Sequence, residues 1–176
     1  MIKKKTMNKT EILNLTTQQL YDHILKYFNV RELVSPGLYE KYINYGVYFI
    51  LSRFDKRLLE TILWVRINVN LKITVNTWLW GGRFEQRGLR DTSTTMVQSR
   101  AKKNVAWLSA HTVAMALDYD VEGQTAVEHR EWLKQHENEL PHKIRLERNY
   151  KNEPISWVHL DVCDDPKNPK IYEFDI

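Results

Sequence analysis

Three segments carry apolar residues at every third or fourth position, which is the spacing of a helix that packs one face on a core. The first covers residues 17–28 and starts with a capping-box pattern at Thr16. The third begins at Thr125 with a similar pattern and ends before Pro141. The second begins at Asp55, and its apolar stripe consists of Leu58, Leu59, Ile62, Leu63 and Ile67. The sequence therefore predicts three amphipathic helices.

Two later segments alternate apolar and polar residues, which is the period of a strand with one buried face. In residues 115–121 this alternation places Asp118 and Asp120 together on the polar face. In residues 156–163 it buries Val158, Leu160 and Val162 and leaves on the other face Trp157, His159 and Asp161. The polar faces of both predicted strands thus carry side chains suited to chemistry.

A shorter strand at residues 71–75 leads into a loop at residues 76–95 that is rich in Gly, Arg, Thr and Trp. Loops of this length are uncommon in small domains and are often binding elements. The chain has 176 residues, 43% of them hydrophobic, which is enough for a buried core. We expect an α+β fold with a small antiparallel sheet packed against helices, divided into an N-terminal basic segment and helix at 1–32 and a main domain at 33–176.

Charge and apolar content restrict the partners. The net charge of +4 is spread along the chain rather than gathered in a tail, so we expect no nucleic-acid partner. No segment approaches the roughly 20 apolar residues of a membrane span, so we expect no membrane insertion. The basic start lacks the apolar stretch of a signal peptide, and the single Cys163 forms no internal disulfide. We expect a monomer that is synthesised in the cytoplasm.

Three side chains are candidates for a metal site. If the two strands with polar faces pair in one sheet, Asp118 and His159 lie on the same surface, and His111 lies one short turn before the first strand. Two imidazoles and one carboxylate leave a coordination position open for water on zinc, and zinc lowers the pKa of such a water to about 7. On spacing alone, the alternative is that all three are ordinary surface or hydrogen-bonded residues.

Two stretches of the chain resemble the zinc D-alanyl-D-alanine carboxypeptidase family, which includes phage endolysins and shares its fold with the hedgehog signalling domain. They are SAHTVAMALD at 109–118 and WVHLD at 157–161. The family pattern is Ser-x-His-x-x-Gly-x-Ala-x-Asp, followed later by an aromatic-rich strand that ends in a second metal-binding His. The resemblance implies a hedgehog-like fold with Zn²⁺ bound by His111, Asp118 and His159.

The resemblance also implies residues that bind substrate. The stretch RGLR at 87–90 looks like the loop that places a substrate-binding arginine, and Arg90 is our candidate for it. A guanidinium suits this role because it binds a carboxylate through two parallel hydrogen bonds. Ser109 and Trp157 complete the predicted substrate-binding set, and we expect Ser109 to shape the turn of His111.

The chain departs from the family pattern at two positions. Ala114 replaces the usual Gly, which matters if the backbone there needs a positive φ. Ser156 stands where many members have a catalytic acid, three residues before the final His. We therefore expect Glu153 to be the catalytic base, because it is similar in position to the glutamate of the hedgehog-like branch. Asp120 is the second candidate, and Asp161 is a third that could instead orient a metal ligand.

The function that the resemblance implies is hydrolysis of peptide bonds in bacterial peptidoglycan stem peptides, by a carboxypeptidase or an endopeptidase. Such an enzyme would act on the cell wall after release by a holin or as part of a phage particle. One alternative is a non-catalytic cell-wall-peptide-binding or phage structural domain on the same fold. Another is a non-haem iron oxygenase, since His159-Leu-Asp161 has the His-x-carboxylate form, although no His follows Asp161.

Overall fold

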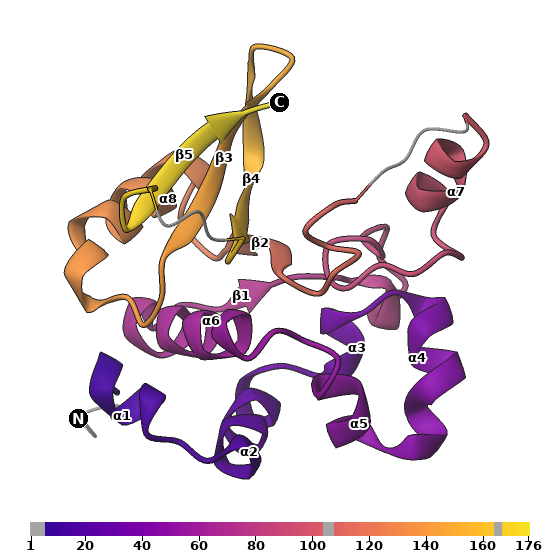
Figure 1. Ribbon diagram of the computed structural model, residues 1–176, viewed down its shortest axis with the longest axis horizontal. Coiled ribbons are helices and arrows are strands. Elements are labelled where there is room, and N and C mark those ends of the chain that lie inside the picture. Colours follow the sequence, from indigo (N-terminus) through magenta and orange to yellow (C-terminus); the bar gives the residue numbers. More distant parts are fainter. Residues whose placement is uncertain (1–5, 104–107, 164–166) are drawn as a thin grey trace.

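The computed structural model describes residues 6–103, 108–163 and 167–176. Figure 1 shows helices of the first half of the chain as a lower layer, with a sheet and one further helix above them. The helices of the first half are α1 (Lys9–Leu13), α2 (Thr17–Tyr27), α3 (Val30–Leu33), α4 (Pro36–Tyr42), η1 (Ile43–Tyr45), α5 (Val47–Leu51) and α6 (Lys56–Val69). The predicted α+β class is confirmed.

The second half holds the sheet. Its elements are β1 (Ile73–Thr74), η2 (Trp78–Trp80), α7 (Thr95–Ala101), β2 (Ala116–Val121), α8 (Ala126–Gln135), η3 (Glu137–Glu139), β3 (Ile144–Tyr150), β4 (Glu153–Asp161) and β5 (Ile171–Asp175). The strand order is β1-β2-β4-β3-β5. In Figure 1, α7 stands apart from the strands on the opposite side of the molecule.

Local side-chain bonds explain where the predicted helices begin. Thr16 and Thr125 both form complete capping boxes, with Gln19 and Glu128 as the third residue of each helix. Asp55 caps α6 by accepting a hydrogen bond of 2.9 Å from the backbone N–H of Arg57. All three predicted helices are therefore confirmed, within a residue or two at most boundaries.

The expectation of an antiparallel sheet is wrong at one edge. β1, β2, β4 and β3 pair antiparallel, but β5 runs parallel to β3. β4 ends beside the start of β3, where Asp161 pairs with Arg145. β5 begins at the same level on the other side of β3, where Ile171 pairs with Ile144. Because β5 begins beside the first residue of β3 and pairs with the edge of β3 that β4 leaves free, it must run in the same direction as β3.

One hydrophobic core joins the two layers. Its fully or almost fully buried members include Ile12 and Leu20 of the N-terminal helices, Trp64 of α6 and Tyr119 of β2. The rings of Trp64 and Trp132 lie 5.7 Å apart and connect α6 to α8. In the part of the chain that the structure describes, the helices of 1–32 thus share their core with the rest. None of the helices described there has the length and apolar character to cross a membrane.

The loop predicted at residues 76–95 is tied to the body of the protein. The buried Asn76 side chain accepts a hydrogen bond from the backbone N–H of Arg87 at 2.9 Å and donates one to the carbonyl of Val34 at 3.2 Å. A backbone bridge between Val34 and Leu89 adds a second connection. These bonds hold residues 87–90 beside the first strand of the site described next.

Candidate metal centre

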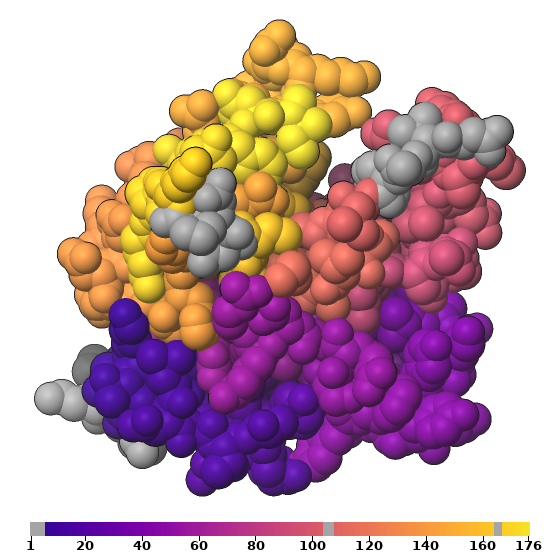
Figure 2. Space-filling view, in the orientation of Figure 1, coloured from indigo at the N-terminus to yellow at the C-terminus, as the bar shows by residue number. Residues whose placement is uncertain are grey.

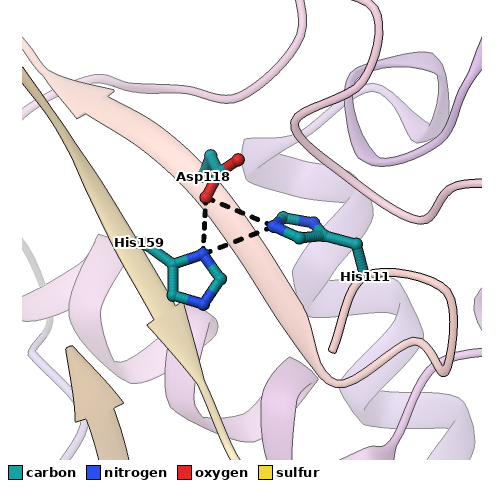
Figure 3. Close-up of side chains that lie close together, drawn as sticks. All are labelled: His111, Asp118 and His159. Atoms are coloured by element: carbon teal, nitrogen blue, oxygen red, sulfur yellow. Dashed lines mark hydrogen bonds and ion pairs between the residues drawn. The ribbon is translucent and has the colours of Figure 1, made fainter. Parts of the chain in front are cut away.

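Three side chains from separate parts of the chain point toward one another in Figure 3. Asp118 comes from β2, His159 from β4 and His111 from the turn before β2. The Oδ1 atom of Asp118 lies 2.7 Å from Nδ1 of His159 and 3.3 Å from Nε2 of His111, and the two nitrogens are 3.3 Å apart. Asp118 and His159 are direct partners in the β2–β4 register. The predicted convergence is confirmed.

These distances fit a metal ion. Ligand atoms about 2.1 Å from a tetrahedral ion are roughly 3.4 Å from one another. Two of the three observed separations are 3.3 Å, and the third, at 2.7 Å, is a hydrogen bond that an ion would replace. All three residues are buried. Among the described residues, the group formed by His111, Asp118 and His159 could hold a metal ion.

The turn of His111 is built by short-range hydrogen bonds. The Thr112 hydroxyl donates to the carbonyl of Ser109 at 2.8 Å, and the backbone N–H of Thr112 donates to Oγ of Ser109 at 3.3 Å. The predicted role of Ser109 in shaping this turn is confirmed. No substrate contact of Ser109 follows from these bonds, so its substrate-binding role stays a prediction.

A backbone carbonyl orients the His111 ring. Nδ1 of His111 lies 3.0 Å from the carbonyl oxygen of Gly88, so Nδ1 carries the proton and donates it. The lone pair of Nε2 then faces the other two ligands. Gly88 is needed here, because a Cβ atom at this position would lie 2.0 Å from the carbonyl oxygen of Leu33.

A carboxylate orients the second imidazole. Nε2 of His159 lies 3.1 Å from Oδ2 of the fully buried Asp161, so Nε2–H donates and Nδ1 is left for the metal. Arg145 holds Asp161 in turn, with Nε and Nη2 at 2.8 and 3.1 Å from its two oxygens. Asp161 thus serves as the orienting partner that the sequence suggested. It faces the nitrogen of His159 that points away from the ligand cluster, which argues against an iron site that uses both residues as ligands.

A guanidinium holds the third ligand. Nη2 of Arg90 donates to Oδ2 of Asp118 at 3.1 Å, which leaves Oδ1 directed at the imidazoles. Burial opposes ionisation of Asp118, but the nearby imidazoles of His111 and His159 outweigh it and hold the pKa of this carboxyl well below its usual range. Asp118 is therefore available as an anionic ligand at neutral pH.

The two imidazoles have opposite electrostatic environments. Burial lowers the pKa of His111, and Asp118 only partly opposes this shift. Burial also acts on His159, but its hydrogen bonds to Asp118 and Asp161 prevail and raise its pKa to about 9. Without an ion, the proton in the cluster is therefore held on His159, between two carboxylates.

Two of the predicted substrate-binding residues lie next to the ligands. Arg90 is buried, and besides Asp118 it donates to the carbonyl of Gln86 and contacts the sulfur of Met96 at 3.2 Å. Its contact with a metal ligand was not predicted from the sequence. Trp157 is half-buried in β4, two residues before His159. Their contacts with substrate stay predictions.

The two predicted catalytic residues, Glu153 and Asp120, lie at different positions relative to the metal-binding cluster. Glu153 is exposed at the start of β4 and pairs with Tyr150 beside the hairpin turn, whereas His159 pairs with Glu147, with a register irregularity between the two pairs. Asp120 lies two residues after Asp118 and forms an ion pair with Arg87.

The structure brings another carboxylate to the site. Glu147 of β3 is the direct strand partner of His159 and is 7% exposed. Burial raises the pKa of its carboxyl, and the charges of His159, Asp118 and Arg90 also act on it. Glu147 was not among the predicted site residues because β3 was not predicted, although the apolar Ile144 and Leu146 alternate there with polar residues.

Ala114 adopts the backbone conformation that its place in the turn suggested. Its φ angle is 61°, in the left-handed region that favours glycine, and its side chain is buried.

Comparison of the whole chain with protein-family models, with curated proteins and with solved structures gave no match.

Proposed function

We propose that this protein is a zinc metallopeptidase that hydrolyses peptide bonds in the stem peptides of bacterial peptidoglycan. The observation that carries the proposal is the buried cluster of His111, Asp118 and His159, with ligand atoms 2.7 to 3.3 Å apart. In a structural zinc site four side chains fill the coordination sphere, whereas two imidazoles and one carboxylate leave a position for substrate or water. This donor set is typical of zinc hydrolases.

The second partners of the imidazoles support the same conclusion. Metal-binding histidines usually donate their other N–H to a carbonyl or carboxylate. His111 has the carbonyl of Gly88 and His159 has the carboxylate of Asp161 in these positions. When bound, zinc would polarise the scissile carbonyl and lower the pKa of water to about 7.

Glu147 is the residue that we propose to move the proton. Its carboxyl lies beside His159 in the neighbouring strand, and burial raises its pKa toward the neutral range in which general acid–base catalysis is most effective. As a carboxylate it accepts a proton from the attacking water, and as an acid it returns that proton to the leaving amine nitrogen. Arg90 holds Asp118 in place through a hydrogen bond to Oδ2. Glu147 replaces Glu153 in this role.

The resemblance to the D-alanyl-D-alanine carboxypeptidase family supports the choice of substrate. The family has Gly at the third position after the first metal-binding His, and the corresponding Ala114 has the positive φ that favours Gly. A hedgehog-like fold and action on the cell wall, after release by a holin or within a phage particle, belong to this same proposal.

Metal analysis combined with digestion of purified peptidoglycan tests the proposal. We expect the wild type to retain close to one zinc per chain after dialysis and to release peptide fragments, and a chelator to stop the release. His111→Ala should lose both metal and activity. Glu147→Gln should keep its metal but lose about 10²- to 10⁴-fold in kcat. Glu153→Gln is the matched control, because it removes an exposed carboxylate of the same hairpin, and it should behave as the wild type.

A second function, recognition of cell-wall peptide without hydrolysis, is favoured by Ser156, a hydroxyl at the position of the usual catalytic acid. The two functions differ in one measurement. A wild-type protein that retains its metal and binds peptidoglycan but releases no fragments would contradict the peptidase and support the binding domain.

A further inference from the structure

A row of side chains crosses the sheet at the metal centre and ends on its outermost strand. Its members, each the direct strand partner of the next, are Asp118, His159, Glu147 and Phe174. Direct partners point to the same face of a sheet, so Phe174 of β5 lies on the face that carries the candidate ligands. Among the described strands β5 pairs only with β3, and Figure 2 shows it in yellow at the surface of the molecule. The metal centre is thus connected to an edge strand.

The ring of Phe174 contacts two groups of this centre. Its centroid lies 6.0 Å from that of the His159 ring at an interplanar angle of 88°, the edge-to-face geometry that aromatic pairs favour. The guanidinium carbon of Arg145 lies 4.9 Å from the Phe174 centroid, within the range of a cation–π contact. The half-buried Phe174 therefore lies against a candidate ligand and against the arginine that holds Asp161.

These contacts form a closed network of four side chains. His159 donates to Asp161, which accepts two hydrogen bonds from Arg145. Arg145 lies over Phe174, and Phe174 returns to His159. The side chain of Asp161 is fully buried, whereas that of Arg145 is 31% exposed. A partly exposed arginine has several rotamers available, and an aromatic face against its guanidinium restricts them. In this network, Phe174 is the group that restricts Arg145.

From these contacts we infer that Phe174 is a positioning residue of the metal centre. It holds Arg145 against Asp161, and Asp161 fixes the orientation of the His159 imidazole. Metal binding and the docking of β5 on the sheet are therefore coupled, and each strengthens the other by the same factor. The inference rests on the metal centre of the proposed peptidase and adds to it a strand that the proposal did not use.

Zinc affinity, measured in competition with a chromophoric chelator, tests the inference without any substrate. Phe174→Leu keeps an apolar side chain but removes the aromatic face. It should weaken zinc binding about tenfold, because disturbing the partners that orient a metal-binding histidine costs about 10- to 100-fold. Phe174→Tyr keeps the face and should bind zinc within about twofold of the wild type.

The chain offers a matched control in Tyr172. It lies two positions before Phe174 in the same strand, is 39% exposed, and is the direct partner of Arg145 in β3. Among the described residues, its ring makes no contact with another ring or with a cation. Tyr172→Leu should therefore leave the zinc affinity within about twofold of the wild type. A loss as large as that of Phe174→Leu would overturn the inference.

Arg145→Lys tests the same network from its other end. A lysine keeps the charge but cannot bind both oxygens of Asp161, so this variant should also weaken zinc binding about tenfold. It keeps the inference testable if Phe174→Leu does not fold. Wild-type zinc affinity in Arg145→Lys, or in a folded Phe174→Leu, would overturn the inference.

A double-mutant cycle shows whether Phe174 acts through Asp161. In the Asp161→Asn background the connection from Phe174 to His159 is already broken, so Phe174→Leu should weaken zinc binding there by no more than about threefold. If Phe174→Leu costs as much in this background as in the wild type, the two residues act independently and the inference is wrong.

Hydrogen exchange measures the coupling from the side of β5. Edge strands open locally, and saturating zinc should slow the exchange of the backbone amides of residues 171–175 about tenfold in the wild type. Zinc should slow them far less in Phe174→Leu, and an equal effect in both proteins would refute the coupling. If the protein shows this coupling but releases no fragments from peptidoglycan, the peptidase proposal fails and the positioning role of Phe174 stands. If it digests peptidoglycan but Phe174→Leu binds zinc as the wild type does, the inference fails and the peptidase proposal stands.

Discussion

Replacing Asp118 by Asn should destabilise the metal-free protein strongly. Asp118 and its partner Arg90 form a buried ion pair, with side chains 11% and 8% exposed and 3.1 Å between Oδ2 and Nη2. An amide at this position leaves the guanidinium buried without an anion, and losing one partner of a buried pair costs about 3–5 kcal/mol. In a chain of this size, such a loss lowers the melting temperature by roughly 6–20 °C.

The same strand contains the control. Asp120 also pairs with an arginine, Arg87, but its side chain is 43% exposed. Exposed pairs contribute about 0–1 kcal/mol, so Asp120→Asn should change the free energy of unfolding by no more than that. Both variants make the same chemical change two residues apart, and they differ in burial and in contact with the imidazoles.

Urea unfolding with and without added zinc gives both readouts. Zinc at about 1,000 times its Kd should stabilise the wild type and Asp120→Asn by roughly 4 kcal/mol. It should stabilise Asp118→Asn far less, because an amide oxygen without charge is a weaker ligand. If the two variants have the same stability in chelator, or gain equally from zinc, our reasoning about this cluster is refuted.

Three further predictions follow from single residues. Ala114→Gly should leave the protein's stability unchanged or raise it by up to about 1 kcal/mol, because φ is 61° at this position. Ala116→Gly in β2 is the control and should destabilise the protein by about 1 kcal/mol. If thermal unfolding shows the same loss of stability for both variants, this reasoning is wrong. Burial lowers the pKa of His129 to about 4. As the pH falls, the histidine of the unfolded chain therefore takes up its proton at a higher pH than that of the folded chain. About 3 kcal/mol of stability should be lost between about pH 6.5 and pH 4. His129→Gln should flatten that dependence in urea titrations, and an unchanged slope would exclude this residue as its source. Asp161→Asn should weaken zinc binding about 10- to 100-fold in competition with a chromophoric chelator, since it orients His159; wild-type affinity would show that orientation is unimportant.

Helix starts and the candidate metal ligands could be predicted from the sequence because each rests on a short-range pattern. The caps at Thr16, Asp55 and Thr125 involve residues two or three positions apart. The polar face of β2 follows from the two-residue period of a strand, which places Asp118 opposite the apolar side chains. These signals need no knowledge of the partner strand.

Glu147, the residue proposed to move the proton, could not be predicted in the same way. Whether Glu153 reaches His159 depends on whether the intervening residues form a loop or a strand, and the six-residue spacing is compatible with both. The structure has an irregular strand, in which Glu153 pairs with Tyr150 and His159 pairs with Glu147. Glu147 lies twelve positions before His159 in the sequence and reaches it only because β3 pairs with β4 in this register.

By itself, the sequence determined the kinds of side chain that the site contains and which face of β2 and β4 carries them. The tertiary structure decided which of them meet. Asp118 and His159 are neighbours because hydrogen bonds between β2 and β4 set one register, and a shift of one residue would turn the ligands to opposite faces. Arg90, Glu147 and Arg145 join them through other strands and loops, so their partners follow only from the packing of the whole chain.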